Sequence, residues 1–427
     1  ECDQPPGPGF ARPDHAAGAV GRSKVTAARP PLSLYVHMPW CVRKCPYCDF
    51  NSHQLPAGGL PEQAYLRALL DDIDFTARGH EEREIVSVFF GGGTPSLFSP
   101  RSVATVLARA RRWVEFVADV EFTLEANPGT LERGRFDGYR EAGINRVSLG
   151  VQSFDDQKLR ALGRIHNGAE TQAAISDLRA GGIDNFNLDL MYGLPRQSAD
   201  EAPREADLAL DNRPAHISHH QLTPAPGTGF AKRPPELPAD EAVCETQLAC
   251  QDRLAAGGYD QYEVSAYAGS SRRCRHNLNY WRFGDYLGVG AGAHGKLTDA
   301  ANGEVVRTAR SRHPAKYMAA TSPEQRIAER RVITPAERVF EFFLNTLRLR
   351  EGIDAELFER RTGLAWRHAE PRVELARRKG FLWKHPSGQW MTSSLGRRFL
   401  NDLQMIFLPS ERDGDSVSGP EPGSLTD

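Results

Sequence analysis

The sequence lacks three features that would assign the chain to common functional classes. It has no basic excess, because 53 lysines and arginines stand against 55 acidic residues, for a formal net charge of -2. That balance gives no electrostatic basis for a nucleic-acid partner. No apolar run approaches the roughly 20 residues that cross a bilayer, and residues 1–31 hold no apolar signal-peptide core. We therefore expect no nucleic acid, membrane association only through a partner protein, and a disordered leader over residues 1–31.

Cysteine is scarce, with seven residues in a chain of 427, which excludes the disulfide framework of a small secreted protein. Three of them, Cys41, Cys45 and Cys48, nevertheless form one CxxxCxxC segment, and no fourth cysteine follows nearby. Three thiolates on one loop can hold three irons of a [4Fe-4S] cluster and leave the fourth iron open to a small molecule. The alternatives are an accidental grouping or a zinc site with a distant fourth ligand. Unpaired thiolates also indicate a reducing compartment, most simply the cytoplasm.

Short apolar runs alternate with longer helical stretches between residues 32 and 265, within a composition that is 40% hydrophobic and 25% charged. The predicted strands are residues 33–37, 85–90, 120–126, 146–151, 185–191 and 216–222. The predicted helices are residues 61–77, 101–113, 131–142, 169–180, 200–210 and 239–256. This order predicts an α/β fold with a parallel sheet. Many of the strands end in glycine or polar residues, as they do at the active-site face of parallel barrels.

The pattern breaks after residue 265. Residues 266–312 are rich in glycine and aromatics, and we expect an irregular connection there. Residues 290–295 match GxGxxG, but neither the preceding strand nor the following helix of a dinucleotide site is evident, so we expect a flexible glycine loop. Residues 313–408 are mostly helical and end near a short strand pair, which predicts a small winged-helix-like domain. Residues 409–427 are polar and predicted to be disordered.

The residues around the three cysteines carry a family resemblance. Residues 34–40 read LYVHMPW and run directly into Cys41, and Asp49 and Phe50 follow Cys48. The segment resembles the cluster loop of the radical S-adenosylmethionine (SAM) superfamily, in the branch that contains anaerobic coproporphyrinogen III dehydrogenases and HemW heme chaperones. The resemblance runs from about residue 33 to 400. It implies a partial (β/α)6 TIM-like barrel, a [4Fe-4S] cluster on the three cysteines, bound SAM and an external electron donor.

The resemblance also implies SAM contacts around the barrel mouth. Tyr35 lies six residues before Cys41 and Tyr47 lies between Cys45 and Cys48. A glycine turn with Gly92, Gly93 and Thr94 follows the second predicted strand. Glycines at a strand end let the backbone approach a ligand closely. Four polar residues match further family positions that hold SAM: Glu125, Gln152, Arg164 and Asp189. Any one of these alone would be an ordinary strand-end residue or a simple tight turn; their recurrence on successive elements favours binding.

A second informative segment is HNLNYW at residues 276–281, after Cys274. An imidazole beside large aromatics suits a heme iron and its ring, and HemW-like chains carry a similar segment that is linked there with heme. His276 is therefore a candidate heme ligand and Cys274 a weaker one. The alternative is a histidine packed in a polar core. His219 and His220 are adjacent on a predicted strand, so their side chains should point to opposite faces, which argues against a shared metal.

One departure decides between the functions of this branch. The decarboxylase typically has another cysteine two residues after the third ligand, where this chain has Phe50. The resemblance thus favours a heme chaperone that binds a [4Fe-4S] cluster, SAM and heme, and that delivers heme to acceptor proteins. Oxygen-independent coproporphyrinogen III oxidation, a SAM-dependent decarboxylation in porphyrin biosynthesis, is the alternative. A radical enzyme acting on another substrate is a third interpretation. Heme or a porphyrin is the expected ligand, and a homodimer is a possible assembly.

Overall fold

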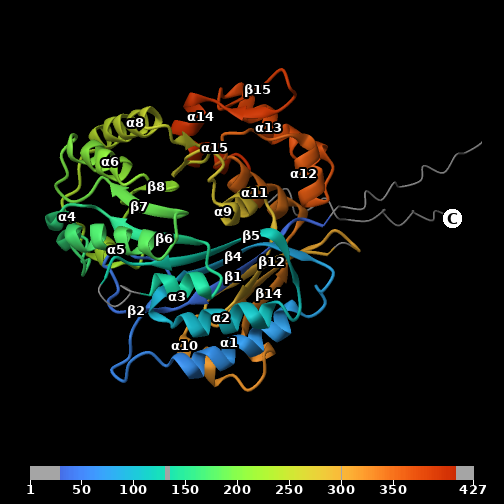
Figure 1. Cartoon of the computed structure of the whole chain (residues 1–427). Coiled ribbons are helices and arrows are strands. Elements are labelled where there is room, and N and C mark those ends of the chain that lie inside the picture. The colour runs from blue at the N-terminus through green and yellow to red at the C-terminus, as the bar shows by residue number, and fades with distance from the viewer. Residues whose placement is uncertain (1–28, 130–134, 300, 410–427) are drawn as a thin grey trace, which may run out of the picture.

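Six strands of the first 221 residues lie parallel in one sheet, in the order in which they occur along the chain. The computed structural model describes residues 29–129, 135–299 and 301–409 (Figure 1). These strands are β1 (Leu32–Met38), β4 (Glu84–Gly92), β5 (Glu115–Ala126), β6 (Arg146–Gln152), β7 (Phe186–Tyr192) and β8 (His216–Gln221). The predicted α/β fold with a six-stranded partial barrel is confirmed. Nearly all of the predicted leader and of the predicted tail lies outside the described residues.

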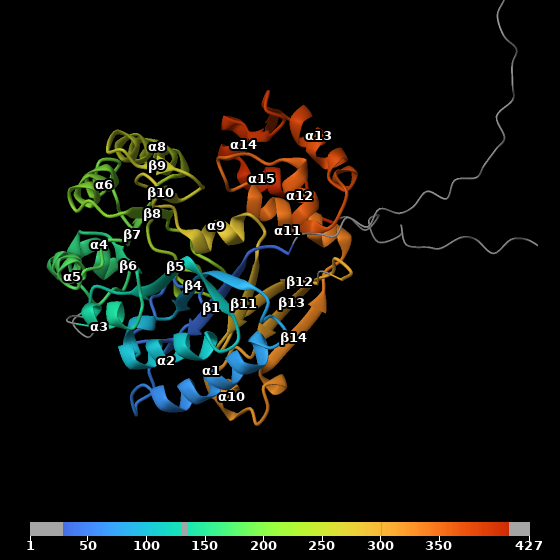
Figure 2. The same ribbon diagram turned by 45° about the vertical axis from the view of Figure 1, so that its right-hand side comes forward.

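Helices connect these strands and cover the outer face of the sheet (Figures 1 and 2). They are α1 (Glu62–Ala77), α2 (Pro100–Ala110), α3 (Phe136–Glu141), α4 (Asp156–Ala161), α5 (Gly168–Ala180), α6 (Glu201–Asp211) and α8 (Asp240–Ala256). The short helix α7 (Gly229–Lys232) lies instead against the cysteine loop, where the Phe230 amide donates to the Pro46 carbonyl (2.9 Å). The strands are buried on both faces, as parallel strands usually are. On β1, Leu34 and Val36 join the core under α1, whereas Tyr35 turns inward and stacks on Phe89. The alternation of a strand thus separates core residues from residues that face the barrel interior.

The sheet continues past β1, where we expected an irregular connection over residues 266–312. This expectation is wrong. After β9 (Asp260–Gln261), β10 (Ala266–Ala268) and α9 (Arg275–Trp281), β11 (Asp285–Val289) pairs in parallel with β1. The strands β12 (His294–Thr298), β13 (Val305–Arg310) and β14 (Ile327–Val332) extend the sheet antiparallel, to twelve strands in the part described. β11 was missed because it begins with the charged residue Asp285. The buried Asp285 carboxylate pairs with Arg83 (2.9 Å) and Lys296 (3.0 Å), and no local pattern in the sequence indicates these partners.

The GxGxxG segment is the turn between β11 and β12, and it is not a flexible loop. Tyr65 on α1 accepts a hydrogen bond from the Ala291 amide (2.9 Å), and Asp72 accepts one from the Gly290 amide (3.1 Å). Gly292 has a φ of +84°, and a Cβ there would lie 2.1 Å from the Asn51 side chain. The glycines therefore permit close packing against α1 and the cysteine loop. A strand does precede them, but a strand and not a helix follows.

The C-terminal part forms a separate core of helices with one hairpin. Its elements are α10 (Pro314–Ala319), α11 (Pro335–Thr346), α12 (Ala355–Thr362), α13 (Glu370–Arg378), β15 (Leu382–Lys384), β16 (Trp390–Thr392), α14 (Ser394–Arg398) and α15 (Leu400–Met405). Of these, α10 packs with α1 beneath the sheet, whereas α11 to α15 sit above it, in agreement with a winged-helix-like domain. In both views α9 lies between the strands of the barrel and α11 (Figures 1 and 2). This helix therefore joins the two parts where the barrel is open.

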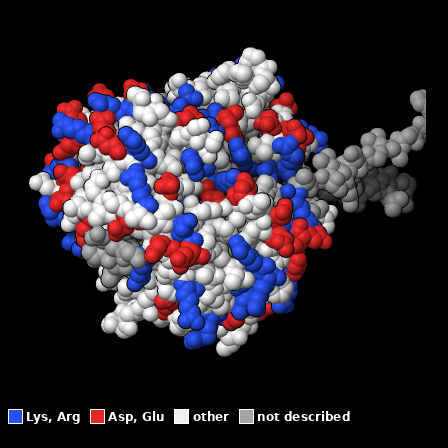
Figure 3. Space-filling model, viewed as in Figure 1, with Lys and Arg blue, Asp and Glu red and all other residues white. Residues whose placement is uncertain are grey.

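Charge is distributed evenly on the face that Figure 3 shows, where acidic and basic side chains intermingle. This agrees with the formal net charge of -2. Among the residues described, no helix has the length and apolar character needed to cross a membrane.

Candidate functional site

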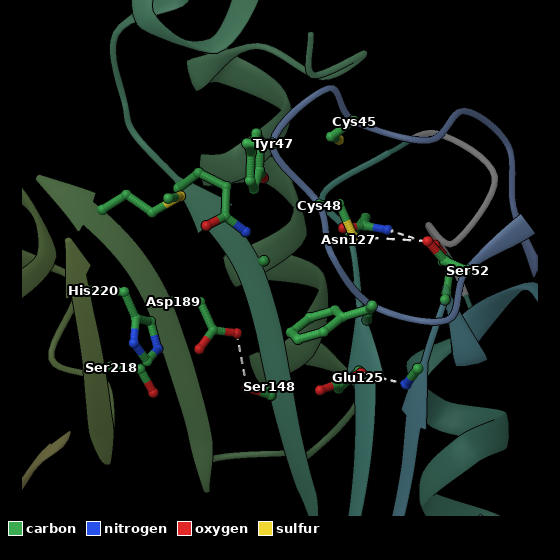
Figure 4. A pocket seen from close by; sticks show the side chains of 18 of the residues that line it. Cys45, Tyr47, Cys48, Ser52, Glu125, Asn127, Ser148, Asp189, Ser218 and His220 are labelled. Carbon is green, nitrogen blue, oxygen red and sulfur yellow. Dashed lines mark hydrogen bonds between the residues drawn. The ribbon is translucent and has the colours of Figure 1, made fainter. Parts of the chain in front are cut away.

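A cavity of about 670 Å³ opens at the carboxyl ends of the parallel strands and extends down their inner face. Such a volume is in the range of small-molecule sites. The structure brings eleven of the thirteen predicted site residues into its lining: Cys41, Cys45, Cys48, Tyr47, Gly92, Gly93, Thr94, Glu125, Gln152, Arg164 and Asp189. Figure 4 shows Cys45 and Cys48 on one side of this space and Glu125, Ser148 and Asp189 along the strands below them.

The cysteine loop follows β1 and is fixed by short-range contacts. Its two ends pair in parallel as β2 (Trp40–Cys41) and β3 (His53–Gln54). Lys44 bridges the loop by donating hydrogen bonds to the carbonyl oxygens of Phe50 (3.0 Å) and Ser52 (3.1 Å). All three thiols are partly exposed. Burial raises the pKa of the Cys41 thiol, although a hydrogen bond with Thr94 opposes the shift. The loop therefore holds three thiols together with hydrogen-bond donors.

The glycine turn after β4 lies directly beneath that loop. Gly92 has a φ of +115°, and a Cβ there would lie 2.5 Å from the ring of His37. A Cβ on Gly93 would lie 2.6 Å from the carbonyl oxygen of Trp40. Side chains are thus excluded at both positions by conformation or by space. The turn also contacts β5, because the Gly92 amide donates to Glu125 Oε2 at 3.0 Å.

Two acidic residues, Glu125 on β5 and Asp189 on β7, face the cavity from strands that β6 separates. Burial raises the pKa of Glu125 to about 8, and the negative charge of Asp189 adds to the shift. Asp189 accepts hydrogen bonds from Ser148 Oγ (2.9 Å) and Asn187 Nδ2 (2.8 Å). Glu125 is therefore mostly protonated at neutral pH and ready to ionise when a donor binds.

The wall opposite the glycine turn comes from β6 and the segment after α4. Gln152 ends β6 with a φ of +67°, a left-handed conformation that is costly outside glycine and that concentrates at functional sites. Arg164 donates to Asn127 Oδ1 (2.5 Å) and to the Gly150 carbonyl (2.7 Å), and its Nη1 lies 3.8 Å from Cys45 Sγ. Arg164 thus places a hydrogen-bond donor beside the sulfur of Cys45.

Tyr35 and His276 lie outside the cavity lining. Tyr35 Oη is 2.9 Å from His37 Nδ1. His276 is 2% exposed, and the Phe89 ring stacks on it at 4.7 Å between ring centroids. Phe89 itself lines the cavity and thus separates both side chains from it. Their predicted binding roles stay predictions, and heme ligation by His276 requires Phe89 to move.

The three histidines of β8 have separate environments. His219 is buried and stacks on Tyr192 at 4.6 Å, whereas His220 lines the cavity. The predicted opposite orientation of this pair is confirmed. His216 hydrogen-bonds Asn187 Oδ1 (2.6 Å) and Tyr262 Oη (2.8 Å), so its role is structural.

Sequence reasoning assigned no place in this cavity to several polar residues of its lining, among them Asn127, Arg146, Ser148, Trp281 and Arg348. A signal existed for three of them. Ser148 and Arg146 precede Gln152 by four and six residues on one strand, and Asn127 follows Glu125 by two, so each shares a face with a predicted residue. Trp281 and Arg348 come from α9 and from just after α11, and nothing local to them indicates that these elements close a barrel cavity.

The fold and the cysteine-lined cavity define a radical SAM protein, and sequence comparison agrees. Residues 35–209 match the radical SAM superfamily, and residues 333–398 match the HemN C-terminal domain. Among solved structures, coproporphyrinogen III oxidase (HemN) from Escherichia coli aligns with a TM-score of 0.74 at 21% identity, over 90% of this chain and 91% of that one. At this identity the likeness concerns the fold.

Two curated relatives narrow the class. The heme chaperone HemW of Haemophilus influenzae is 45% identical over 386 residues, which cover 90% of this chain and 99% of the relative. The heme chaperone HemW of Escherichia coli is 45% identical over 379 residues, covering 89% and 98%. The chain belongs to the HemW family of the radical SAM superfamily.

Proposed function

We propose that the chain is a heme chaperone that carries a [4Fe-4S] cluster and SAM and that transfers heme to acceptor proteins. The observation that carries this proposal is the 45% identity to two proteins named heme chaperone HemW, over nearly their whole length. Phe50 supports it, because this exposed ring stands at the cavity mouth where the decarboxylase typically has a cysteine. Coproporphyrinogen oxidation is supported by the likeness in fold alone.

The donor set at the mouth fits a cluster held at three corners. Cys41, Cys45 and Cys48 would bind three irons, and they are the thiols that line the cavity in the part of the chain that the structure describes. Arg164 beside Cys45 and Ser52 Oγ, 3.6 Å from Cys48 Sγ, would hydrogen-bond to the sulfurs. When bound, the cluster supplies an iron that chelates SAM and an electron that cleaves it, which an external donor replenishes.

The residues below the mouth would hold SAM itself. The turn at Gly92, Gly93 and Thr94 would receive its amino group, and Glu125 would accept hydrogen bonds from it. Gln152, Arg164 and Asp189 would bind its other polar groups, and Tyr47, packed on Phe230, would cover it. Tyr35 would act indirectly, because its hydroxyl group holds the His37 ring, which packs against Gly92.

His276 has the protonation state that an iron ligand needs. Its Nδ1 lies 3.1 Å from Ser87 Oγ, and its Nε2 has no hydrogen-bond partner among the residues described. Burial lowers the pKa of His276 to about 3, so the ring is neutral at physiological pH. A neutral imidazole with one nitrogen held and the other free is the usual form of a metal ligand.

Hemin titration of the full chain, reconstituted with iron and sulfide under anaerobic conditions, tests the function. We expect uptake of one equivalent with a shifted Soret band, followed by transfer to an apo b-type cytochrome. His276→Ala should weaken uptake, whereas His368→Ala, on an exposed 3-10 turn (Trp366–His368), should bind like the wild type. Lack of stoichiometric uptake by the wild type would overturn the chaperone function; equal uptake by His276→Ala would overturn only the ligand assignment.

A further inference from the structure

Arg146 is a buried charge without a partner. It begins β6, is 2% exposed and lines the cavity. A guanidinium has five N–H donors, yet Arg146 makes no hydrogen bond or ion pair with any residue that the structure describes, and its Nε is fully buried. Burial alone would lower the pKa of Arg146, but the charges of Cys274, Glu121 and further neighbours outweigh it and raise that pKa, so the group stays charged. Its guanidinium therefore keeps hydrogen-bond donors that a ligand in the cavity can use.

The nearby carboxylates are engaged elsewhere. Glu121 accepts hydrogen bonds from the backbone amides of Arg275 and His276, each at 3.1 Å, at the start of α9. Asp189 is held by Ser148 and Asn187. Both acids act on Arg146 through their charge without contacting it. Neither is free to turn toward Arg146 without breaking those bonds.

Two further donors on the α9 side of the cavity also lack acceptors. The indole N–H of Trp281 and the Nε of Arg348 are buried and unpaired among the described residues. The guanidinium of Arg348 lies 4.3 Å from the centre of the Trp281 ring, and its Nη2 donates to Glu263 at 3.0 Å. Glu263 is already shared with Ser265. This wall therefore carries two donors without acceptors beside a carboxylate that is already in use, which favours an acceptor such as a carboxylate on the ligand.

We propose that the α9 side of the cavity binds the carboxylates of a second ligand, with Arg146 as the main contact. Arg146 lies six residues before Gln152, about 20 Å along an extended strand, and two residues before Ser148, which is in register with Glu125. The site therefore lies below the residues proposed for SAM and adjoins Glu125. The charge of Arg146 acts on Cys274 at the start of α9, whereas Trp281 ends that helix, about 10 Å away. A ligand with two carboxylates can reach both donor groups. The source is a porphyrin propionate, which rests on the proposed function, or a free small dicarboxylic acid.

Arg146→Met in the full chain tests the site, since methionine keeps the length and apolar stem but removes the charge. Metal-free protoporphyrin IX, its dimethyl ester and glutarate are the probes, because none of them allows iron ligation. We expect the variant to bind protoporphyrin at least tenfold more weakly and to bind the ester like the wild type. Arg160→Met, which removes an exposed charge on α4, should bind all three probes like the wild type. Binding of glutarate alone, weakened by Arg146→Met, also supports the site and identifies a free acid as the source.

A second readout separates ligand binding from a structural role. Glutarate or protoporphyrin should raise the melting temperature of the wild type and not that of Arg146→Met, whatever the two melting temperatures are without ligand. Equal ligand-induced shifts in the two proteins, equal affinities of the variant and the wild type for the diacid, or binding of neither acid overturns the proposal. Hemin uptake that is unaffected by Arg146→Met removes this site and leaves the proposed function standing. Failure of hemin uptake together with Arg146-dependent glutarate binding overturns the proposed function and leaves this site standing.

Discussion

Replacement of Glu125 by glutamine should remove the pH dependence that deprotonation of Glu125 gives to the affinity for SAM. The carboxyl group lies in the cavity, where burial and the charge of Asp189 raise its pKa to about 8. The Gly92 amide at 3.0 Å and the charge of Arg146 oppose the shift without cancelling it. A ligand amino group or hydroxyl prefers an ionised acceptor. Wild-type Glu125 must therefore lose its proton before it binds the ligand at full strength, whereas glutamine has none to lose.

The size of the effect follows from the pKa. With a pKa of about 8, about 1% of Glu125 is ionised at pH 6 and about half at pH 8. A hydrogen bond to a charged group contributes about 2 kcal/mol, or about 30-fold in affinity. The wild type should therefore bind SAM about as tightly as Glu125→Gln at pH 6, and about 15-fold more tightly at pH 8. The ratio of the two proteins cancels titration of the ligand itself.

Equilibrium dialysis of labelled SAM against both proteins, anaerobically loaded with iron and sulfide, measures this ratio at half-unit steps between pH 6 and 8.5. A ratio that stays constant would mean that Glu125 does not titrate in this range. A wild-type advantage of full size already at pH 6 would mean that the carboxyl is ionised throughout. Either result would refute the reasoning that burial holds this group protonated.

Three further predictions concern the mouth of the cavity. Cys45→Ala should lose bound iron and sulfide, by chemical analysis, whereas Cys244→Ala on α8 should retain them. Gly93→Ala should lower the free energy of unfolding by about 1–3 kcal/mol in urea titration, because the new methyl group meets the Trp40 carbonyl. Gly58→Ala, where a Cβ meets nothing within 4 Å, should have little effect. Phe89→Ala should increase hemin affinity by opening the path to His276, and an unchanged affinity would place the iron elsewhere.

The barrel could be predicted because its elements are local and repetitive. Six strands and the helices between them are each encoded by a contiguous pattern, and most of their predicted ends lie within a few residues of the observed ones. The second half of the sheet could not be predicted in this way. β11 carries Asp285, and β13 carries Arg310, whose buried pair with Asp72 joins it to α1 (2.9 Å). Such charges resemble loop residues until the distant partner that neutralises them is known.

The cavity likewise has one part that local sequence patterns predict and one part that depends on distant elements. Its upper half consists of strand ends and turns, where one short motif fixes both the backbone and the ligand groups, and eleven predicted residues meet there. Its lower half depends on α9 and on Arg348, which reach the cavity only because the C-terminal domain packs over the open side of the barrel. A cofactor that a whole superfamily binds requires residues that short local motifs hold in place. Selectivity for a second ligand can depend on residues from another domain, because one arginine from that domain changes the lower wall and leaves the cluster loop unchanged. Variants of Arg348 should thus alter ligand choice without loss of iron, whereas variants of Cys45 should abolish both.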